Sequence, residues 1–493
     1  LGRASIDAIE SLRERVAAPE LRAHYSAASQ HYYEDQIDML MARAEASPAS
    51  SAAFTRRALT ISESARARLT IDLLREASAD PRSRADPALL EAERQLLEEL
   101  AAKAQQRDRL VRRRAVDETA RITITSLDGA MTDLENRLNI LRTKLRRSDP
   151  AYLYVSPTET ITVEDFQDLL APDSVLLQYE LGDKRSFVWV VTRDAVEAIE
   201  LADRATIEQA ALDVLDTLND PGRNHGALRQ LDINLQQLTT YVLSPVIHLM
   251  AGKRRVLIAP DGALEYIPFA ALPATQESND KDMVDSYEIV TIPSMSVVAA
   301  LRARAGTAPE KTIAVFADPI VDASDPRLGN HRAQPVASLP AETLTRSSDS
   351  LRRLPSTANE ARAIAALVPA EERYVALNFD ASRENLKTMN LGNYRYLHFA
   401  THGVVDARYP ALSSLVLSRF DAKGDPQEGA LRLFDILDLE LNAELVVLSA
   451  CDTALGRQIR GEGLIGLAQG FMYAGARSLL VSLWQVPDRA TAE

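Results

Sequence analysis

One cysteine and one histidine carry the chemistry that this sequence could perform. Cys451 is the single cysteine among 493 residues, and it directly follows the apolar run 444–450. His402 ends a similar apolar run that begins at residue 394, and Gly403 comes next. A cysteine attacks as its thiolate and needs a base close by, and the pKa of histidine suits that task near neutral pH. These residue types indicate nucleophilic catalysis by a thiol, provided that the fold brings them together.

The elements that must position this pair are two buried strands. Each apolar run is short, ends at turn-type residues and lacks polar alternation, which is typical of strands in a parallel sheet. The reactive crevice of such a sheet lies just beyond the carboxyl ends of its strands. We therefore expect His402 and Cys451 to end adjacent strands of an α/β sheet and to face each other there.

Five motifs around this pair have an order and spacing that resemble the CHAT domain, a caspase-like peptidase domain that often follows tetratricopeptide helices in bacteria. They occupy residues 398–403, 412–418, 448–456, 460–468 and 474–484. The resemblance extends back to about residue 165. It implies a caspase-like fold, which is a doubly wound, mostly parallel α/β sheet with flanking helices. It also implies a non-catalytic half over residues 165–300 and a catalytic half over residues 310–493.

The activity that the resemblance implies is that of a cysteine endopeptidase with a Cys–His dyad. The Cys451 thiolate attacks a peptide carbonyl, and His402 moves the proton and protonates the leaving amine. Backbone N–H groups of Gly403 and Cys451 are the candidates for the oxyanion hole, because glycine permits a close approach of the backbone. An acidic residue in the specificity pocket would select arginine or lysine before the scissile bond. The candidates for that residue are Asp406, Asp452 and Glu462.

Other interpretations of these residues remain open. A free cysteine is most often a small buried hydrophobe, and the domain would then be a catalytically silent scaffold that binds protein. The same dyad could also support acyl transfer or ester hydrolysis, and Asp452 could instead cap the helix after the nucleophile. His398 lies four residues before His402, but the zinc motif with that spacing needs a helix and a glutamate. A packed, hydrogen-bonded structural role for His398 is therefore favoured, and no metal or other cofactor is expected.

Residues 1–150 form a distinct helical region. They are rich in alanine, arginine, glutamate and leucine, and leucines recur at 4-3-4 spacing over residues 134–145, which is typical of amphipathic helices. We predict degenerate tetratricopeptide-like hairpins that lead into a long helix pair, with a plain helical bundle as the alternative. The first interpretation gives this region a role in binding a protein activator or regulator.

Residues 151–493 are predicted to form the second domain, and the alternation of strands and helices through residues 312–484 argues for a doubly wound α/β sheet. The predicted strands lie at 174–180, 186–192, 255–262 and 312–319. Residues 320–355 are predicted to form a long mobile loop, and Asp380 is the expected N-cap of a later helix. The chain ends soon after Trp484, before a further helix that the resemblance leads us to expect, so we expect a truncated C-terminus.

Composition and charge restrict the class of protein. The net charge of −14 argues against a general binder of nucleic acids or anionic membranes. A single cysteine excludes an internal disulfide framework and favours a reducing, cytoplasmic setting. No apolar run approaches the ~20 residues that cross a bilayer. The expected partners are a protein substrate and a protein regulator.

Overall fold

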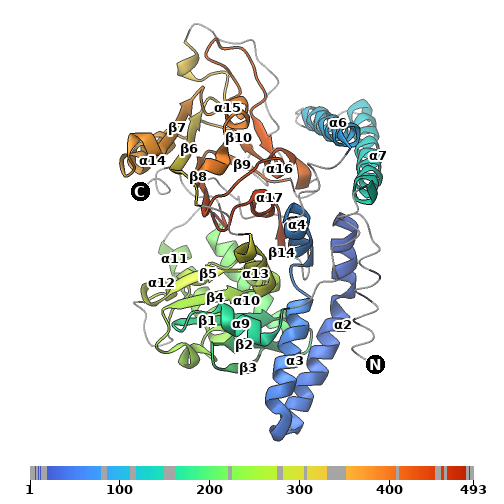
Figure 1. The fold of residues 1–493 in the computed structure, drawn as a ribbon, viewed down its shortest axis with the longest axis vertical. Helices are drawn as coiled ribbons and strands as arrows, with labels where there is room; N and C mark the ends of the chain where they lie inside the picture. Colours follow the sequence, from blue (N-terminus) through green and yellow to red (C-terminus); the bar gives the residue numbers. More distant parts are fainter. Residues whose placement is uncertain are drawn as a thin grey trace. The chain divides into compact units, whose positions relative to one another are not determined.

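The chain forms two compact units, each composed of segments that are distant in sequence (Figure 1). The computed structural model describes residues 6, 9, 12, 19–78, 86–111, 118–148, 161–219, 225–274, 281–304, 308–329, 351–406, 410–449, 457–459, 463–484 and 488. Unit 1 comprises Leu1–Asp72, Ser156–Ala303 and Gln458–Leu464, and unit 2 comprises Leu73–Val155, Arg304–Arg457 and Ile465–Glu493. These units run across the predicted boundary at residue 150, because the N-terminal helices contribute to both.

The N-terminal region is helical, as its composition predicts. Its helices are α2 (Pro19–Ala46), α3 (Ser51–Ser64), α4 (Arg68–Ser78), α6 (Pro87–Val111) and α7 (Glu118–Ser148), with a 3-10 turn, η1 (Pro48–Ser50), between the first two. α2 packs on α3, and α6 packs along α7. Leu134 and Leu138 from the predicted leucine stripe are buried. None of the described helices is both long and apolar enough to cross a membrane.

Unit 1 contains a five-stranded sheet of order β3-β2-β1-β4-β5. Its strands are β1 (Ser174–Glu180), β2 (Ser186–Val191), β3 (Val196–Leu201), β4 (Arg255–Ala259) and β5 (Glu288–Thr291). β1 and β2 correspond to the predicted strands at 174–180 and 186–192 and pair antiparallel as a hairpin, whereas β4 is parallel to β1 and to β5. Ile37 of α2 and Leu59 of α3 pack with Trp189 of β2 in one apolar core.

The helices of unit 1 connect or cover these strands. They are α9 (Val163–Leu169), α10 (Arg204–Leu218), α11 (His225–Val242), α12 (Met283–Ser286) and α13 (Met295–Ala303), together with 3-10 turns η2 (Ile247–Met250), η3 (Gly262–Tyr266) and η4 (Phe269–Ala271). The predicted strand over 255–262 ends at Ala259. Asp261 is the N-cap of η3 and Gly262 is its first residue. This turn starts the connection from β4 to β5.

Unit 2 contains a second five-stranded sheet, of order β15-β12-β8-β6-β7, in which all neighbours are parallel. Its strands are β6 (Lys311–Pro319), β7 (Arg373–Asn378), β8 (Tyr394–Ala400), β12 (Leu445–Ser449) and β15 (Leu479–Val481). The ring centroids of Phe316 and Phe399 lie 5.4 Å apart, and those of Phe399 and Phe471 lie 5.6 Å apart. A helical region followed by an α/β region with a mostly parallel sheet is therefore the observed fold class, as predicted.

Short helices and one small antiparallel sheet complete unit 2. The helices are α14 (Ser356–Ala366), α15 (Arg383–Thr388), α16 (Leu433–Leu437) and α17 (Leu467–Ala474), with 3-10 turns η5 (Pro326–Leu328), η7 (Ala370–Glu372), η8 (Leu391–Asn393) and η9 (Pro410–Leu412). The small sheet joins β9 (His402–Val404), β10 (Ser414–Val416) and β11 (Ala430–Arg432). β13 (Arg457–Ile459) pairs with β14 (Gly463–Ile465), and most of this pair falls in the segment Gln458–Leu464 of unit 1. Leu97 of α6 and Leu138 of α7 pack against Phe434 of α16.

The predicted N-cap of α15 is wrong. Asp380 is not the N-cap of α15: the cap is Ser382, whose Oγ accepts a hydrogen bond from the Asn385 N–H at 3.2 Å. Asp380 lies in the turn after β7 instead, where its N–H donates to the Leu377 carbonyl at 3.1 Å. Most of the predicted mobile loop lies outside the described residues, so its mobility stays a prediction.

Candidate functional site

His402 lies where the parallel sheet passes into the small antiparallel sheet. β8 stops at Ala400, two residues earlier than the apolar run suggests, because the Thr401 side chain donates a hydrogen bond to the Val416 carbonyl of β10. His402 then begins β9 and stands opposite Val416, with Gly403 opposite Leu415. The histidine thus follows β8 closely but belongs to the next sheet.

The strand that leads to the cysteine is the neighbour of β8. β12 pairs parallel with β8, and Ser449 at its end stands opposite Ala400. His402 follows Ala400 by two positions, and Cys451 follows Ser449 by the same two positions. Cys451 itself lies outside the described residues, as do Asp452 and Glu462. The role of Cys451 as nucleophile and its N–H as oxyanion donor therefore stay predictions.

Among the described residues, one hydrogen-bond partner fixes the orientation of the His402 ring. Nε2 lies 2.6 Å from the carbonyl oxygen of Arg352. A carbonyl oxygen only accepts, so Nε2 carries the proton, and Nδ1 of the neutral ring is the acceptor. Burial lowers the pKa of His402 below its ordinary value, while the Arg352 carbonyl and the charge of Asp488 oppose that shift. The ring is therefore a neutral base at neutral pH, with Nδ1 as its acceptor.

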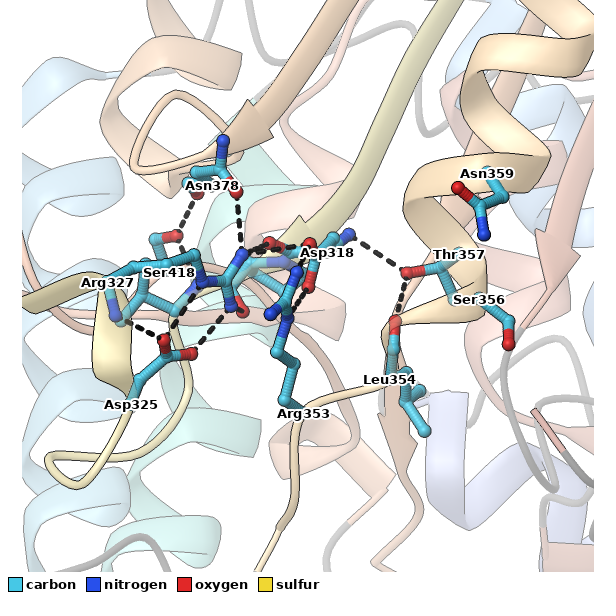
Figure 2. A network of polar contacts seen from close by, with 12 residues as sticks. Asp318, Asp325, Arg327, Arg353, Leu354, Ser356, Thr357, Asn359, Asn378 and Ser418 are labelled. Carbon is cyan, nitrogen blue, oxygen red and sulfur yellow. Dashed lines mark hydrogen bonds and ion pairs between the residues drawn. The ribbon is translucent and has the colours of Figure 1, made fainter. Parts of the chain in front are cut away.

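The segment that supplies this carbonyl is attached to the sheet by side chains (Figure 2). Arg353 Nε and Nη2 donate to the two carboxylate oxygens of Asp318 at 2.8 and 2.6 Å. Thr357 Oγ1 donates to the Leu354 carbonyl at 2.7 Å and accepts from the Asp318 N–H at 3.1 Å. The N–H of Ser356 donates to Asp488 at 3.0 Å. These contacts fix the peptide groups on the C-terminal side of Arg352.

Asp318 is itself held in a strained and buried position at the end of β6. Its φ is +47°, in the left-handed region that non-glycine residues rarely adopt, and the β6–β7 register shifts at this point. Arg327 Nη1 donates to the Asp318 carbonyl at 2.9 Å and lies 2.9 Å from a carboxylate oxygen of the same residue. Arg327 also contacts Asn378, another residue with positive φ, and pairs with Asp325 (Figure 2).

Two more of the predicted site residues, Gly403 and Asp406, lie among the described residues. Gly403 is buried beside it in β9. Asp406 lies just after β9 and is partly buried, and its N–H donates to Ser413 Oγ at 3.0 Å. A part of Asp406 in substrate specificity stays a prediction.

His398 has the structural role that the sequence predicts. It is 5% exposed, and its Nε2 lies 2.9 Å from Glu360 Oε1 on α14. Within the described part of the chain, no group of three or more histidine, cysteine or acidic side chains is arranged to hold a metal ion.

Sequence reasoning missed Arg352, Arg353 and Asp318. A backbone carbonyl carries no signal in a sequence, so the acceptor for His402 was invisible. Asp318 precedes a proline at the end of a predicted strand, which suggested a turn, and Arg353 lies 35 residues further along in the predicted loop. Two such distant residues are matched only by the folded chain.

The chain is similar in part to several known proteins. Two proteins, "Tetratricopeptide repeat protein 28" of Mus musculus and of Homo sapiens, are 45% and 42% identical to the chain over 65 residues. That stretch is 13% of this chain and 3% of each relative, so the chain covers a small part of their length. The Saccharomyces cerevisiae separase–securin complex has a similar structure, with a TM-score of 0.40, 10% identity, and coverage of 76% of this chain and 31% of that one.

The strongest evidence of kinship is a family model. The model described as "CHAT domain" matches residues 232–493, which include β4 and β5 of unit 1 and every strand of unit 2. This match covers more than half of the chain. The protein therefore belongs to the CHAT-domain family.

Proposed function

We propose that this protein is a cysteine endopeptidase in which Cys451 is the nucleophile and His402 is the general base. The observation that carries the proposal is the hydrogen bond from His402 Nε2 to the Arg352 carbonyl. It leaves Nδ1 as the acceptor at the carboxyl ends of β8 and β12, where parallel sheets place their reactive groups. Membership of the CHAT-domain family supports the same assignment.

In the proposed reaction, His402 Nδ1 takes the proton from the Cys451 thiol, and the thiolate attacks the peptide carbonyl. The Arg352 carbonyl stabilises the imidazolium that forms, because it accepts from the positively charged ring. His402 then gives its proton to the leaving amine, and water hydrolyses the thioester. The N–H groups of Gly403 and Cys451 are the proposed donors to the oxyanion.

The remaining features of the proposed enzyme concern its substrate and regulation. Asp406, Asp452 or Glu462 would supply an acidic pocket for an arginine or lysine side chain of a protein substrate. The N-terminal helices would bind a protein activator or regulator. A single reactive thiol suits a reducing compartment, so we propose a bacterial, cytoplasmic setting.

The test is the alkylation rate of Cys451 as a function of pH, because thiolate content sets that rate and no other thiol competes. We expect fast labelling well below pH 8 in the parent chain. His402→Ala should slow labelling at pH 7 by about 100-fold or more, because proton transfer to a positioned base is lost. His398→Gln is the control: it changes a nearby histidine that pairs with Glu360 and should leave the labelling profile unchanged.

Equal, slow labelling of the parent chain and His402→Ala would refute the proposed dyad and favour a catalytically silent scaffold. If the dyad is confirmed, a peptide library and an ester substrate would distinguish the proposed peptidase from an acyl transferase or esterase.

A further inference from the structure

We propose that Asp318 and Arg353 are positioning residues for His402, because their ion pair holds the Arg352 carbonyl against the imidazole. The inference rests on the proposed function and concerns how the base is oriented. Neither residue contacts the His402 ring in the structure. Their effect passes through one backbone carbonyl.

The connection between Arg353 and this carbonyl is direct. The Arg352 carbonyl and the Arg353 nitrogen belong to one planar peptide group, so the anchoring of Arg353 restricts the direction of the carbonyl. The guanidinium binds both oxygens of the Asp318 carboxylate at 2.8 and 2.6 Å. A two-point contact of this kind fixes angle as well as distance, which a single hydrogen bond does not.

Asp318 is suited to serve as the fixed end of this connection. It is 1% exposed, and its N–H, carbonyl and carboxylate are all engaged by Thr357, Arg327 and Arg353. Arg353, in contrast, has a side chain that is 40% exposed and lies outside any helix or strand. The ion pair therefore joins the long, partly exposed side chain of Arg353 to a buried and well-anchored residue of the sheet, Asp318.

The consequence for His402 concerns the proton on its ring. Burial disfavours the charged ring, and the Arg352 carbonyl is one of two groups that oppose this effect, Asp488 being the other. Without a fixed carbonyl, the imidazolium is less stable and the Nε2–H form of the neutral ring is no longer enforced. The Cys451 thiol would then deprotonate at a higher pH, closer to that of an ordinary thiol.

The test compares Arg353→Gln with a matched variant of the same unit, Arg383→Gln. Arg383 also binds a buried carboxylate through two nitrogens, at 3.1 and 2.6 Å from the oxygens of Asp435. Lys387 remains at Asp435 when Arg383 is removed, as Arg327 remains at Asp318 when Arg353 is removed. The two variants therefore remove equivalent ion pairs, one near His402 and one on α15.

Two measurements apply to both variants. Nitrogen NMR of the labelled histidines reports which ring nitrogen of His402 carries the proton, and the alkylation profile of Cys451 reports thiolate content. For Arg353→Gln we expect mixed ring forms and labelling at pH 6.5 that is about tenfold slower. This loss is smaller than the loss of about 100-fold expected when the base itself is removed, because His402 remains present. Arg383→Gln should match the parent in both, and Arg353→Lys should recover part of the loss because it keeps the charge without the fork.

The proposal is overturned if Arg353→Gln keeps the parent's ring form and labelling profile, or if Arg383→Gln changes them equally. Arg353→Lys allows the same decision if Arg353→Gln does not fold. The NMR result does not require a reactive cysteine, so it tests the positioning role even if Cys451 in the parent proves unreactive and the proposed function fails.

Discussion

The two five-stranded sheets both gather acidic residues at the carboxyl ends of their strands, but they use them differently. In unit 1, β1 ends at Glu180 and Asp261 follows β4. Burial raises the pKa of Glu180 to about 7 and that of Glu265 to about 8. In unit 2, Asp318 at the end of β6 is paired with two arginines. The acids of unit 1 therefore lack enough positively charged partners to offset their burial, whereas Asp318 of unit 2 is fully paired.

The difference follows from what each cluster holds in place. Ser62 Oγ of α3 donates to Glu180 at 2.7 Å, and Arg66 after the same helix donates to the Pro260 carbonyl at 2.7 Å. This cluster joins α3 to the sheet of unit 1, and the helix covers it. The Asp318 cluster orients a carbonyl toward a histidine that is only partly buried. Acidic residues at strand ends therefore do not by themselves identify a candidate active site, and the group that they position must be considered with them.

The largest effect on stability should come from Arg66→Ala. Arg66 is 5% exposed and lies 3.4 Å from Glu180, whose Oε1 has no hydrogen-bond partner among the described residues. At pH 8, above the folded-state pKa of Glu180, removal of one partner from this buried ion pair should cost about 3 kcal/mol or more. Arg353→Gln should cost clearly less, because Arg353 is partly exposed. Urea unfolding, monitored by hydrogen exchange of the backbone amides of β1 and β6, checks this ranking of the losses in unfolding free energy. Equal losses in Arg66→Ala and Arg353→Gln would contradict the comparison.

The pH dependence of stability should have opposite signs in the two units. The folded-state pKa of Glu180 is raised to about 7, so folded unit 1 binds a proton that the unfolded chain has released. Its stability should fall as the pH rises from about 4.5 to 7, by a few kcal/mol. Glu180→Gln should flatten this slope in hydrogen exchange of β1.

Asp435 provides the opposite case in unit 2. Burial opposes its ionisation, yet hydrogen bonds from Arg383 and Lys387 outweigh that effect and lower its pKa. This contribution is complete above the ordinary aspartate pKa and is lost as the pH falls below it. Asp435→Asn should therefore reduce stability most at pH 7, and the reduction should shrink as the pH falls from the ordinary aspartate pKa through the lowered folded-state pKa. Stability that instead fell with rising pH in both units would refute the contrast.

The smallest effect on stability should come from a change at the amino ends of the strands of unit 1, opposite to the Glu180 cluster. Arg254 precedes β4 and pairs with Asp173 and Glu288, all three well exposed. Exposed ion pairs gain little over water. Arg254→Ala should leave the unfolding midpoint unchanged within error, and a loss comparable to that of Arg66→Ala would show that strand-end burial is not what distinguishes these sites.

The strands around the proposed site could be predicted from sequence because their signal is local. β8 and β12 are apolar runs, and their adjacency follows from the rules of parallel sheets. The Asp318–Arg353 pair and the Arg352 carbonyl could not be predicted, because they depend on long-range geometry. The Ser382 cap was missed for a smaller reason: two suitable residues lie two positions apart, and only the turn after β7 selects between them. The assignment of the N-terminal helices to both units likewise depends on packing.

The single residue between β8 and β9 has a consequence for how this chain can vary. Thr401 alone joins a parallel sheet to an antiparallel one, so one ladder fixes the backbone before it, at Ala400, and another fixes it from His402 onward. Side chains alternate between faces along a strand, so an insertion of one residue at this junction would turn the imidazole to the opposite face. A change of chain length at this junction should therefore displace the imidazole and remove the proposed activity, whereas Thr401→Ser keeps both the length and the hydroxyl that donates to the Val416 carbonyl.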